Sequence, residues 1–377
     1  MKWNRVRAVA RKEFLHILRD PRSLAMAIAI PVLMLILYGY ALTMDVDRVP
    51  MVIWDQSETP ASREFLAGFF GSRYFALRGH VRDYQELEKA IDSRQAIVAL
   101  VIPADFARRL EAGRLAKVQM IVDGSDSNTA TLAMGYAGAV TETYSRRVSL
   151  RQLQRITSRV PDPPLDLRPR VWFNADLVSR NYIVPGLIAV ILMVIAALLT
   201  SLAMAREWER GTMEQLLSTP VQGRELIYGK LLPYLVVGLV DASLAVLMGR
   251  LVFHVPLRGS LVLLFASTVI FLVGGMSLGM LISIVSRSQL LASQVAMVMT
   301  FLPAVLLSGF IFEISSMPKP VQVVTYLVPA RYFVTLLRGV YLKGVGLNVL
   351  GGEVLLLILF SVALVALAQM KFRKKLE

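Results

Sequence analysis

Six long runs of apolar residues restrict the fold of this chain more than any other feature. The first, residues 24–44, has 21 residues without a charge, which is enough for a helix to cross the ~30 Å hydrocarbon layer of a membrane. The apolar share of the whole chain is 55%, above the ~45–50% of soluble domains. We therefore predict a polytopic α-helical membrane protein. Its six expected transmembrane helices are residues 23–44, 181–205, 231–253, 261–285, 290–312 and 347–370.

Residues 45–180, between the first and second apolar runs, have the pattern of a folded α/β domain. Short apolar or alternating runs that predict strands are interspersed with amphipathic segments that predict helices. The order is β-α-β-α-β-β-α, as expected for a small α/β domain. The strands are expected at 51–54, 74–81, 96–102 and 118–122, and the helices at 62–70, 84–93 and 128–158. A proline-rich linker at 160–169 leads back to the membrane.

The segments at the membrane surface carry patterns of their own. Residues 1–22 contain seven basic residues with apolar residues at helical spacing, which predicts an amphipathic helix in the membrane interface. The alternative is a merely basic flank of the first span. Residues 313–346 contain Pro318, Pro320 and Pro329 between segments too short to cross, so we predict two re-entrant half-helices. Residues 371–377 form a short basic tail.

The distribution of positive charge predicts the topology. With the N-terminus inside, the cytoplasmic segments (1–22, 206–230, 286–289 and 371–377) hold 16 Lys and Arg residues, and the short outer segments and nearby helix ends hold six. This asymmetry places both termini in the cytoplasm and residues 45–180 outside. That domain is nearly neutral, with 19 basic and 17 acidic residues. The net charge of +14 is thus a topology signal, and nucleic acid is not an expected partner.

The sequence lacks the residues that metal centres, thiol nucleophiles and phosphate-binding loops require. The chain has no cysteine and only three scattered histidines, so no metal centre or thiol nucleophile is expected. Residues 223–231 resemble a phosphate-binding loop, but the spacing is one residue too long and Leu231 stands where Ser or Thr is required. Asp123 and Asp126 are expected to form a surface turn. We predict that the chain is not an enzyme and binds no cofactor.

Two polar features lie within the apolar runs. Asp241, midway along the third run, costs at least ~2.5 kcal/mol to insert without a partner. It is either a transport-path or proton-coupling residue, or it bonds Ser293 or Gln294 of another span. An ion-coupled secondary transporter that uses Asp241 is therefore an alternative function. The glycine-rich segment 274–279 has a small-xxx-small pattern that allows close helix packing, within one chain or across a dimer.

Residues 206–230 are a charged amphipathic segment between two spans. Within it, residues 209–220 (ERGTMEQLLSTP) are one of three blocks that match a known family. The others are 11–14 (RKEF) with 19–22 (RDPR), and 307–318 (LSGFIFEISSMP) with 329–334 (PARYFV) and 337–339 (LRG). Together they resemble the permease subunit of ABC-2-type exporters, in the multidrug-efflux branch with a large extracytoplasmic domain. Glu313 departs from the proline that relatives often carry there.

This resemblance implies roles for particular segments. Residues 1–20 would be the interface helix, and residues 207–218 the coupling helix that docks on a separate ATPase. The ATPase contacts would be Glu209, Arg210, Gly211, Thr212, Glu214 and Gln215. The half-helices would close the exit side, and the second and fifth spans would line the path, with Asp241 and Gln294 as pathway residues.

The resemblance also implies the assembly and its location. Two permease chains, identical or paralogous, would combine with two ATPase subunits that bind ATP and Mg²⁺, in the bacterial cytoplasmic membrane. The complex would export hydrophobic or amphipathic, drug- or lipid-like compounds. Membrane lipid and a periplasmic adaptor protein are further expected partners.

Overall fold

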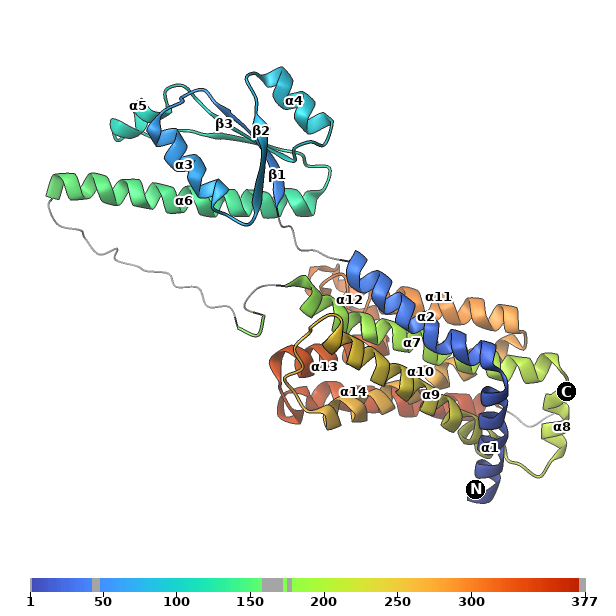
Figure 1. The fold of residues 1–377 in the computed structure, drawn as a ribbon. Helices are drawn as coiled ribbons and strands as arrows, with labels where there is room; N and C mark the ends of the chain where they lie inside the picture. The colour runs from blue at the N-terminus through green and yellow to red at the C-terminus, as the bar shows by residue number, and fades with distance from the viewer. Residues whose placement is uncertain (1, 43–47, 158–171, 175–177, 373–377) are drawn as a thin grey trace. The chain divides into compact units, whose positions relative to one another are not determined.

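The computed structural model describes residues 2–42, 48–157, 172–174 and 178–372. The chain forms two compact units, one of Met1–Met44 with Arg170–Glu377 and the other of Asp45–Pro169. Each unit is described by itself below. The first is a helical bundle and the second an α/β domain (Figure 1).

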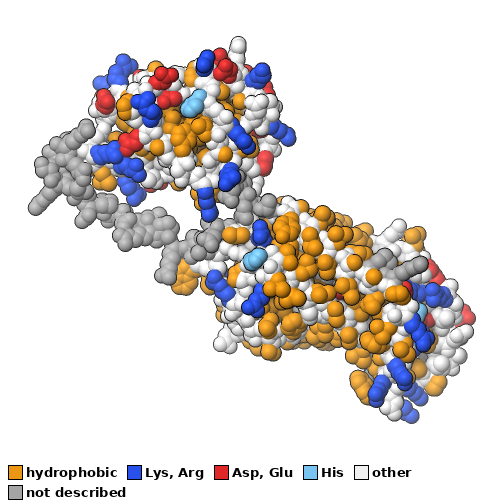
Figure 2. All heavy atoms as spheres, in the orientation of Figure 1, with side chains coloured by type: hydrophobic (Ala, Val, Ile, Leu, Met, Phe, Trp, Pro, Cys, Tyr) orange, Lys and Arg blue, Asp and Glu red, His pale blue; other side chains and the backbone are white. Residues whose placement is uncertain are grey.

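The helical unit contains five helices that are long and apolar enough to cross a membrane, among the described residues. They are α7 (Ser179–Glu209), α9 (Gly223–Leu251), α10 (Leu261–Ser286), α11 (Gln289–Leu306) and α14 (Leu347–Lys371). The first predicted span corresponds to α2 (Pro21–Ala41), whose apolar part at Ala27–Ala41 is shorter. Apolar side chains cover the visible middle of this unit, with charged ones toward its two ends (Figure 2).

Helix α7 lies at the centre of the helical unit. Helices α2, α9, α10, α11 and α13 (Pro329–Arg338) pack around it, and residues 183–197 are buried without interruption. The closest approach is to α10, where a Cβ added at Gly279 would lie 2.2 Å from the Ala197 carbonyl oxygen. Gly275 likewise faces Ala196. The small-residue pattern of 274–279 therefore serves packing within one chain.

The segment after α11 differs from the predicted continuous span at 290–312. Helix α11 ends at Leu306, and the chain turns at Gly309, whose φ is +80°. The Ser308 hydroxyl accepts a hydrogen bond from the Phe310 amide at 3.2 Å, which stabilises the turn. The short helices η1 (Ile314–Ser316) and α12 (Lys319–Thr325) follow. Helix α12 and the continuous segment Pro329–Lys343, which joins α13 to the π-helical turn η2 (Gly339–Lys343), are bent by 84° at the break between them, the geometry of a broken span or a re-entrant loop.

The α/β unit contains a four-stranded sheet with the order β2-β1-β3-β4. Strand β1 (Val49–Asp55) pairs in parallel with β2 (Phe75–His80) and β3 (Val98–Ile102), and β4 (Gln119–Val122) is antiparallel to β3. Helices α3 (Pro60–Phe70) and α6 (Ser127–Thr157) cover one face, and α4 (Tyr84–Asp92) packs on the other. The predicted order is present, with one addition, the short helix α5 (Phe106–Glu111).

Two details of the α/β unit bear on the sequence predictions. Asp126 accepts hydrogen bonds from the Asn128 and Thr129 amides, and Asp123 from the Ser125 amide, so both carboxylates belong to the turn before α6.

The unit ends at Pro169, earlier than the predicted boundary at residue 180. Asn174 belongs to the helical unit, because it hydrogen-bonds Val178 and Asn181 at the start of α7. The predicted linker at 160–169 lies outside the described residues.

Candidate functional site: the charged junction of α1, α7, α8 and α9

The segment between α7 and α9 folds differently from the single helix expected at 207–218. Helix α7 continues through Glu209, so its last turn is part of a span helix, and the separate helix α8 is only Thr212–Ser218. Gly211 separates the two with φ +69°. This left-handed conformation is one that glycine adopts without steric penalty, so Gly211 fixes the direction of α8 relative to α7.

Helix α8 has one buried and one exposed side. Met213 is fully buried in the core of the helical unit, and Leu216 packs against that core. Arg210, Glu214 and Gln215 are exposed. Because a seven-residue helix is marginal by itself in water, we attribute its stability to the Met213 anchor, which leaves the polar side available to a partner.

Two of the predicted contact residues form hydrogen bonds within the helical unit. The Thr212 hydroxyl donates a hydrogen bond to Glu207 Oε2, within the junction. Glu209 accepts hydrogen bonds from the Gln289 amide at 2.6 Å and from the Gln289 side chain at 2.5 Å, which ties the end of α7 to the start of α11. Glu209 and Thr212 therefore hold the segment in place, although Glu209 is itself exposed, as are Arg210, Gly211, Glu214 and Gln215.

A buried ion cluster joins the helices around α8. The Lys230 ammonium on α9 lies 2.7 Å from Glu13 Oε1 on α1 (Trp3–Arg19) and 3.2 Å from Glu207 Oε1 on α7. The side chains of Lys230, Glu13 and Glu207 are 1%, 4% and 11% exposed. Charges this deeply buried are tolerated only when paired in good geometry. The cluster therefore fixes α1, α7 and α9 to one another.

Lys12 closes the cluster on its exposed side. Its ammonium lies 2.8 Å from Glu207 Oε1 and 3.7 Å from Glu13 Oε1. Partial burial works to lower the pKa of Lys12, but the hydrogen bond and charge of Glu207 outweigh it, so the net pKa is raised above the usual value. Lys12 thus stays protonated at neutral pH, and two cations balance the two carboxylates.

A second junction ties α1 to the start of α9. Glu225, which is fully buried, accepts a hydrogen bond from the Lys2 amide at 2.6 Å and one from the Gln222 amide at 3.0 Å. Arg5 lies 3.6 Å from the same carboxylate and donates to the Pro220 carbonyl at 2.5 Å. Helix α1 is therefore bonded to both ends of the connection that contains α8.

The two predicted pathway residues are not brought together. Asp241 is 1% exposed on α9, and neither of its carboxylate oxygens has a hydrogen-bond partner among the described residues. The alternative of a bond to Ser293 or Gln294 is therefore wrong for this chain by itself. Gln294 is exposed on α11, and the Ser293 hydroxyl donates to the Leu290 carbonyl of its own helix.

At its other end, α7 is bonded to the turn after α11. The Tyr182 hydroxyl donates to the Gly309 carbonyl at 3.2 Å. Arg338 of α13 donates to the Gly309 and Phe310 carbonyls at 2.9 and 3.1 Å, and its guanidinium stacks on the Tyr182 ring with the centroid at 3.5 Å. This contact joins two segments of one of the sequence blocks that carry the resemblance, 307–318 and 337–339.

The sequence analysis did not predict that Glu13, Glu207 and Lys230 form a buried ion cluster. The available signal is on α1, where Val6, Val9 and Glu13 fall at i, i+3 and i+7 and share the buried face. A carboxylate on the apolar side of an amphipathic helix requires a buried cation opposite it. The sequence offers several cations near the ends of spans and does not identify Lys230 among them.

These features define a multi-pass membrane protein whose charged junction connects two of its spans to a surface helix. Residues 21–369 match the model of the ABC-2 family transporter protein, and the chain belongs to that family as a permease subunit of ABC exporters. It is 39% identical over 381 residues to the probable multidrug ABC transporter permease YbhS of Escherichia coli K12, over 100% of this chain and 99% of that protein.

Two further relatives are more distant. The chain is 30% identical over 374 residues to the probable multidrug ABC transporter permease YbhR of E. coli K12, covering 99% of each chain. It is also 23% identical over 348 residues to ABC transporter G family member 20 of Dictyostelium discoideum, covering 90% of this chain and 46% of that protein.

Proposed function

We propose that this permease exports hydrophobic or amphipathic compounds across the bacterial cytoplasmic membrane, driven by a separate ATPase that docks on α8. The observation that carries this proposal is the anchoring of α8 by the buried Met213, with Arg210, Glu214 and Gln215 left exposed. The names of the two E. coli relatives support compounds of the drug class.

In this proposal ATP and Mg²⁺ bind to the partner ATPase, and this chain receives the free energy through contact. ATPase movement would tilt α8, and the Glu207 contacts to Lys230, Lys12 and Thr212 would pass that tilt to α7, α1 and α9 as one body. Family membership favours this mechanism over ion-coupled transport through Asp241.

The proposed assembly has two permease chains and two ATPase subunits, with both permease termini in the cytoplasm and residues 45–169 outside. The charge asymmetry of the flanking segments supports this orientation. The exposed apolar face of α11, which includes Val295, Val298 and Leu302, supports a second permease chain or lipid at that surface. A periplasmic adaptor would bind the α/β unit.

Reversal of the charge at Glu214 tests the docking role of α8. The permease is purified with the ABC ATPase encoded beside it, and complex formation, ATP hydrolysis and efflux of amphipathic dyes are measured in reconstituted vesicles. Because Glu214 is exposed and the Met213 anchor is unchanged, Glu214→Lys is expected to leave the permease folded and to reduce ATPase binding or coupled efflux at least tenfold.

The matched control is Glu142→Lys in the α/β unit, where the side chain is 75% exposed. That variant should export at the wild-type rate. Undiminished ATPase binding and efflux in Glu214→Lys would show that α8 is not the docking element. Efflux that needs only an ion gradient, and disappears in Asp241→Asn, would replace the whole proposal with ion-coupled transport.

A further inference from the structure

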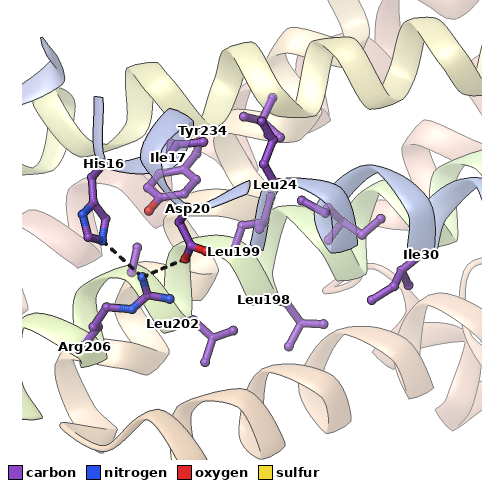
Figure 3. A pocket seen from close by; sticks show the side chains of 14 residues that line it. His16, Ile17, Asp20, Leu24, Ile30, Leu198, Leu199, Leu202, Arg206 and Tyr234 are labelled. Carbon is purple, nitrogen blue, oxygen red and sulfur yellow. Dashed lines mark hydrogen bonds and ion pairs between the residues drawn. The ribbon is translucent and has the colours of Figure 1, made fainter. Parts of the chain in front are cut away.

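A narrow cavity lies beside the charged junction, between α1, α2, α7 and α9. Its volume is about 230 Å³. Most of its wall is apolar, with Leu24 and Ile30 on α2 and Leu198 and Leu202 on α7 (Figure 3). A cavity with such walls in a membrane protein is suited to a hydrocarbon group.

One end of the cavity is polar and carries charges of both signs. Arg206 Nη1 lies 3.9 Å from Asp20 Oδ2 and 3.3 Å from His16 Nε2, and Tyr234 also lines this end (Figure 3). The Arg206 and Asp20 side chains are 26% and 34% exposed. At 3.9 Å the guanidinium and the carboxylate do not form a direct hydrogen bond. They form an ion pair, so a head group at this end of the cavity contacts both a guanidinium and a carboxylate.

The size of the cavity restricts its occupant. Pockets for drug-sized ligands hold roughly 300–1,000 Å³, and this cavity is smaller. It therefore suits a single hydrocarbon chain, with the rest of the ligand outside, better than a multi-ring compound. Its apolar walls come mostly from the span helices α2 and α7. Its polar end combines His16 and Asp20, at the end of the helix that we expect at the membrane surface, with Arg206 of α7 and Tyr234 of α9, which is the arrangement of a lipid at a bilayer boundary.

The charges at the polar end restrict the head group. A purely anionic head group would meet the Asp20 carboxylate, and a purely cationic one would meet the Arg206 guanidinium. A zwitterionic phosphate–amine head group satisfies both, with the phosphate toward Arg206 and the amine toward Asp20. We propose that this cavity binds one acyl chain of a zwitterionic phospholipid, with its head group at Arg206 and Asp20.

We assign this site to a resident lipid and not to a transported compound, because its lining comes from α1, α2, α7 and α9 and includes no residue of α11, the other helix expected along the export path. Arg206 immediately precedes Glu207, whose carboxylate belongs to the buried ion cluster. A lipid bound there contacts α1, α2 and α7 at the junction that would receive the ATPase movement. The head-group composition of the membrane would thereby set how firmly α1 is held against α7.

Photolabelling of the full-length chain tests the site without relying on transport. The chain is placed in phosphatidylcholine nanodiscs that contain a small fraction of phosphatidylethanolamine with a diazirine on its acyl chain, and labelled peptides are mapped by mass spectrometry. We expect labelling concentrated in residues 24–30 and 195–203. Unlabelled phosphatidylethanolamine should compete at least threefold better than phosphatidylglycerol.

Ala203→Trp places an indole in the cavity and should reduce this labelling at least fivefold. Leu355→Trp, at a 57% exposed position on α14, is the matched control and should leave this labelling unchanged. Asp20→Asn provides a second variant that keeps the cavity open, and it should abolish the preference for phosphatidylethanolamine over phosphatidylglycerol. Labelling spread evenly over the apolar surface, unchanged in Ala203→Trp, or competed equally by both lipids would overturn the proposal.

Discussion

Replacement of Lys230 by methionine is expected to release α1 from the helical unit. The Lys230 ammonium bonds the Glu13 and Glu207 carboxylates at 2.7 and 3.2 Å, and methionine of similar length leaves these two carboxylates facing each other. Removing one partner of a buried pair costs about 3–5 kcal/mol. Lys12, whose ammonium lies 2.8 Å from Glu207, still compensates that carboxylate. We therefore expect the free energy that holds α1 against the helical unit to fall by about 3 kcal/mol, the lower end of this range.

The consequence is a change in how often α1 detaches. Since about 1.4 kcal/mol is a factor of ten in an equilibrium constant, about 3 kcal/mol lowers the ratio of docked to detached α1 roughly 100-fold. Hydrogen exchange of the α1 amides, measured on the chain in nanodiscs, reports this ratio directly. Exchange within Trp3–Arg19 should become faster by about two orders of magnitude.

Two further variants make this result specific. Lys319→Met removes an exposed lysine of α12 and should leave α1 exchange unchanged. The double variant Glu13→Gln with Lys230→Met removes the stranded carboxylate along with its cation, so it should recover part of the lost protection. If exchange of α1 in Lys230→Met stays within threefold of wild type, the cluster does not hold the helix, and the argument from burial fails.

Three other changes have expected outcomes. Gly279→Ala brings a methyl group to 2.2 Å from the Ala197 carbonyl oxygen, so α10 must move away from α7. The thermal unfolding temperature should fall by an amount equivalent to about 1–3 kcal/mol. The control Gly351→Ala, with nothing within 4 Å of the added methyl group, should not destabilise the chain. Gly211→Ala must adopt φ +69° at a cost of about 1–2 kcal/mol, and affinity for the ATPase, measured by surface binding, should fall about tenfold. Arg338→Gln leaves the carbonyls of residues 309 and 310 without their charged donor, at about 1.5–3 kcal/mol; amide exchange in residues 307–312 should rise at least tenfold, and an unchanged rate would show that the turn is held by other contacts.

The elements set by local pattern were predictable from the sequence. Five of the six long apolar runs correspond, among the described residues, to helices long and apolar enough to span a membrane, because length and hydropathy alone decide whether a helix suits a bilayer. Helix α1 ends at Arg19 and α2 begins at Pro21, as the Asp20–Pro21 pair indicates. The strand and helix order of the α/β unit follows from its apolar periodicities. Helix α5 was missed because six residues with two arginines carry too little periodicity.

Features set by contact between distant segments were not predictable. The continuation of α7 to Glu209 depends on Glu207 and Glu209 being neutralised by Lys230 and bonded by Gln289, partners 23 and 80 residues away. For the same reason the structural roles of Thr212 and Glu209 could not be read from the segment alone. The end of α11 was missed because residues 307–312 are as apolar as the helix before them, although the Ser308–Gly309 pair is a turn signal.

The continuity of α7 has a mechanical consequence. At 1.5 Å per residue, its 31 residues form a lever arm about 46 Å long. Tyr182 lies about 37 Å from Glu207 along the helix, so a tilt of about 5° at the Glu207 end moves it by roughly 3 Å if the helix stays straight. The hydrogen bond that joins Tyr182 to the Gly309 carbonyl, at 3.2 Å, cannot stretch that far. A displacement of α8 must therefore either carry the α11–α13 turn with it or detach it, so that movement at one end of α7 and opening at the other are a single event.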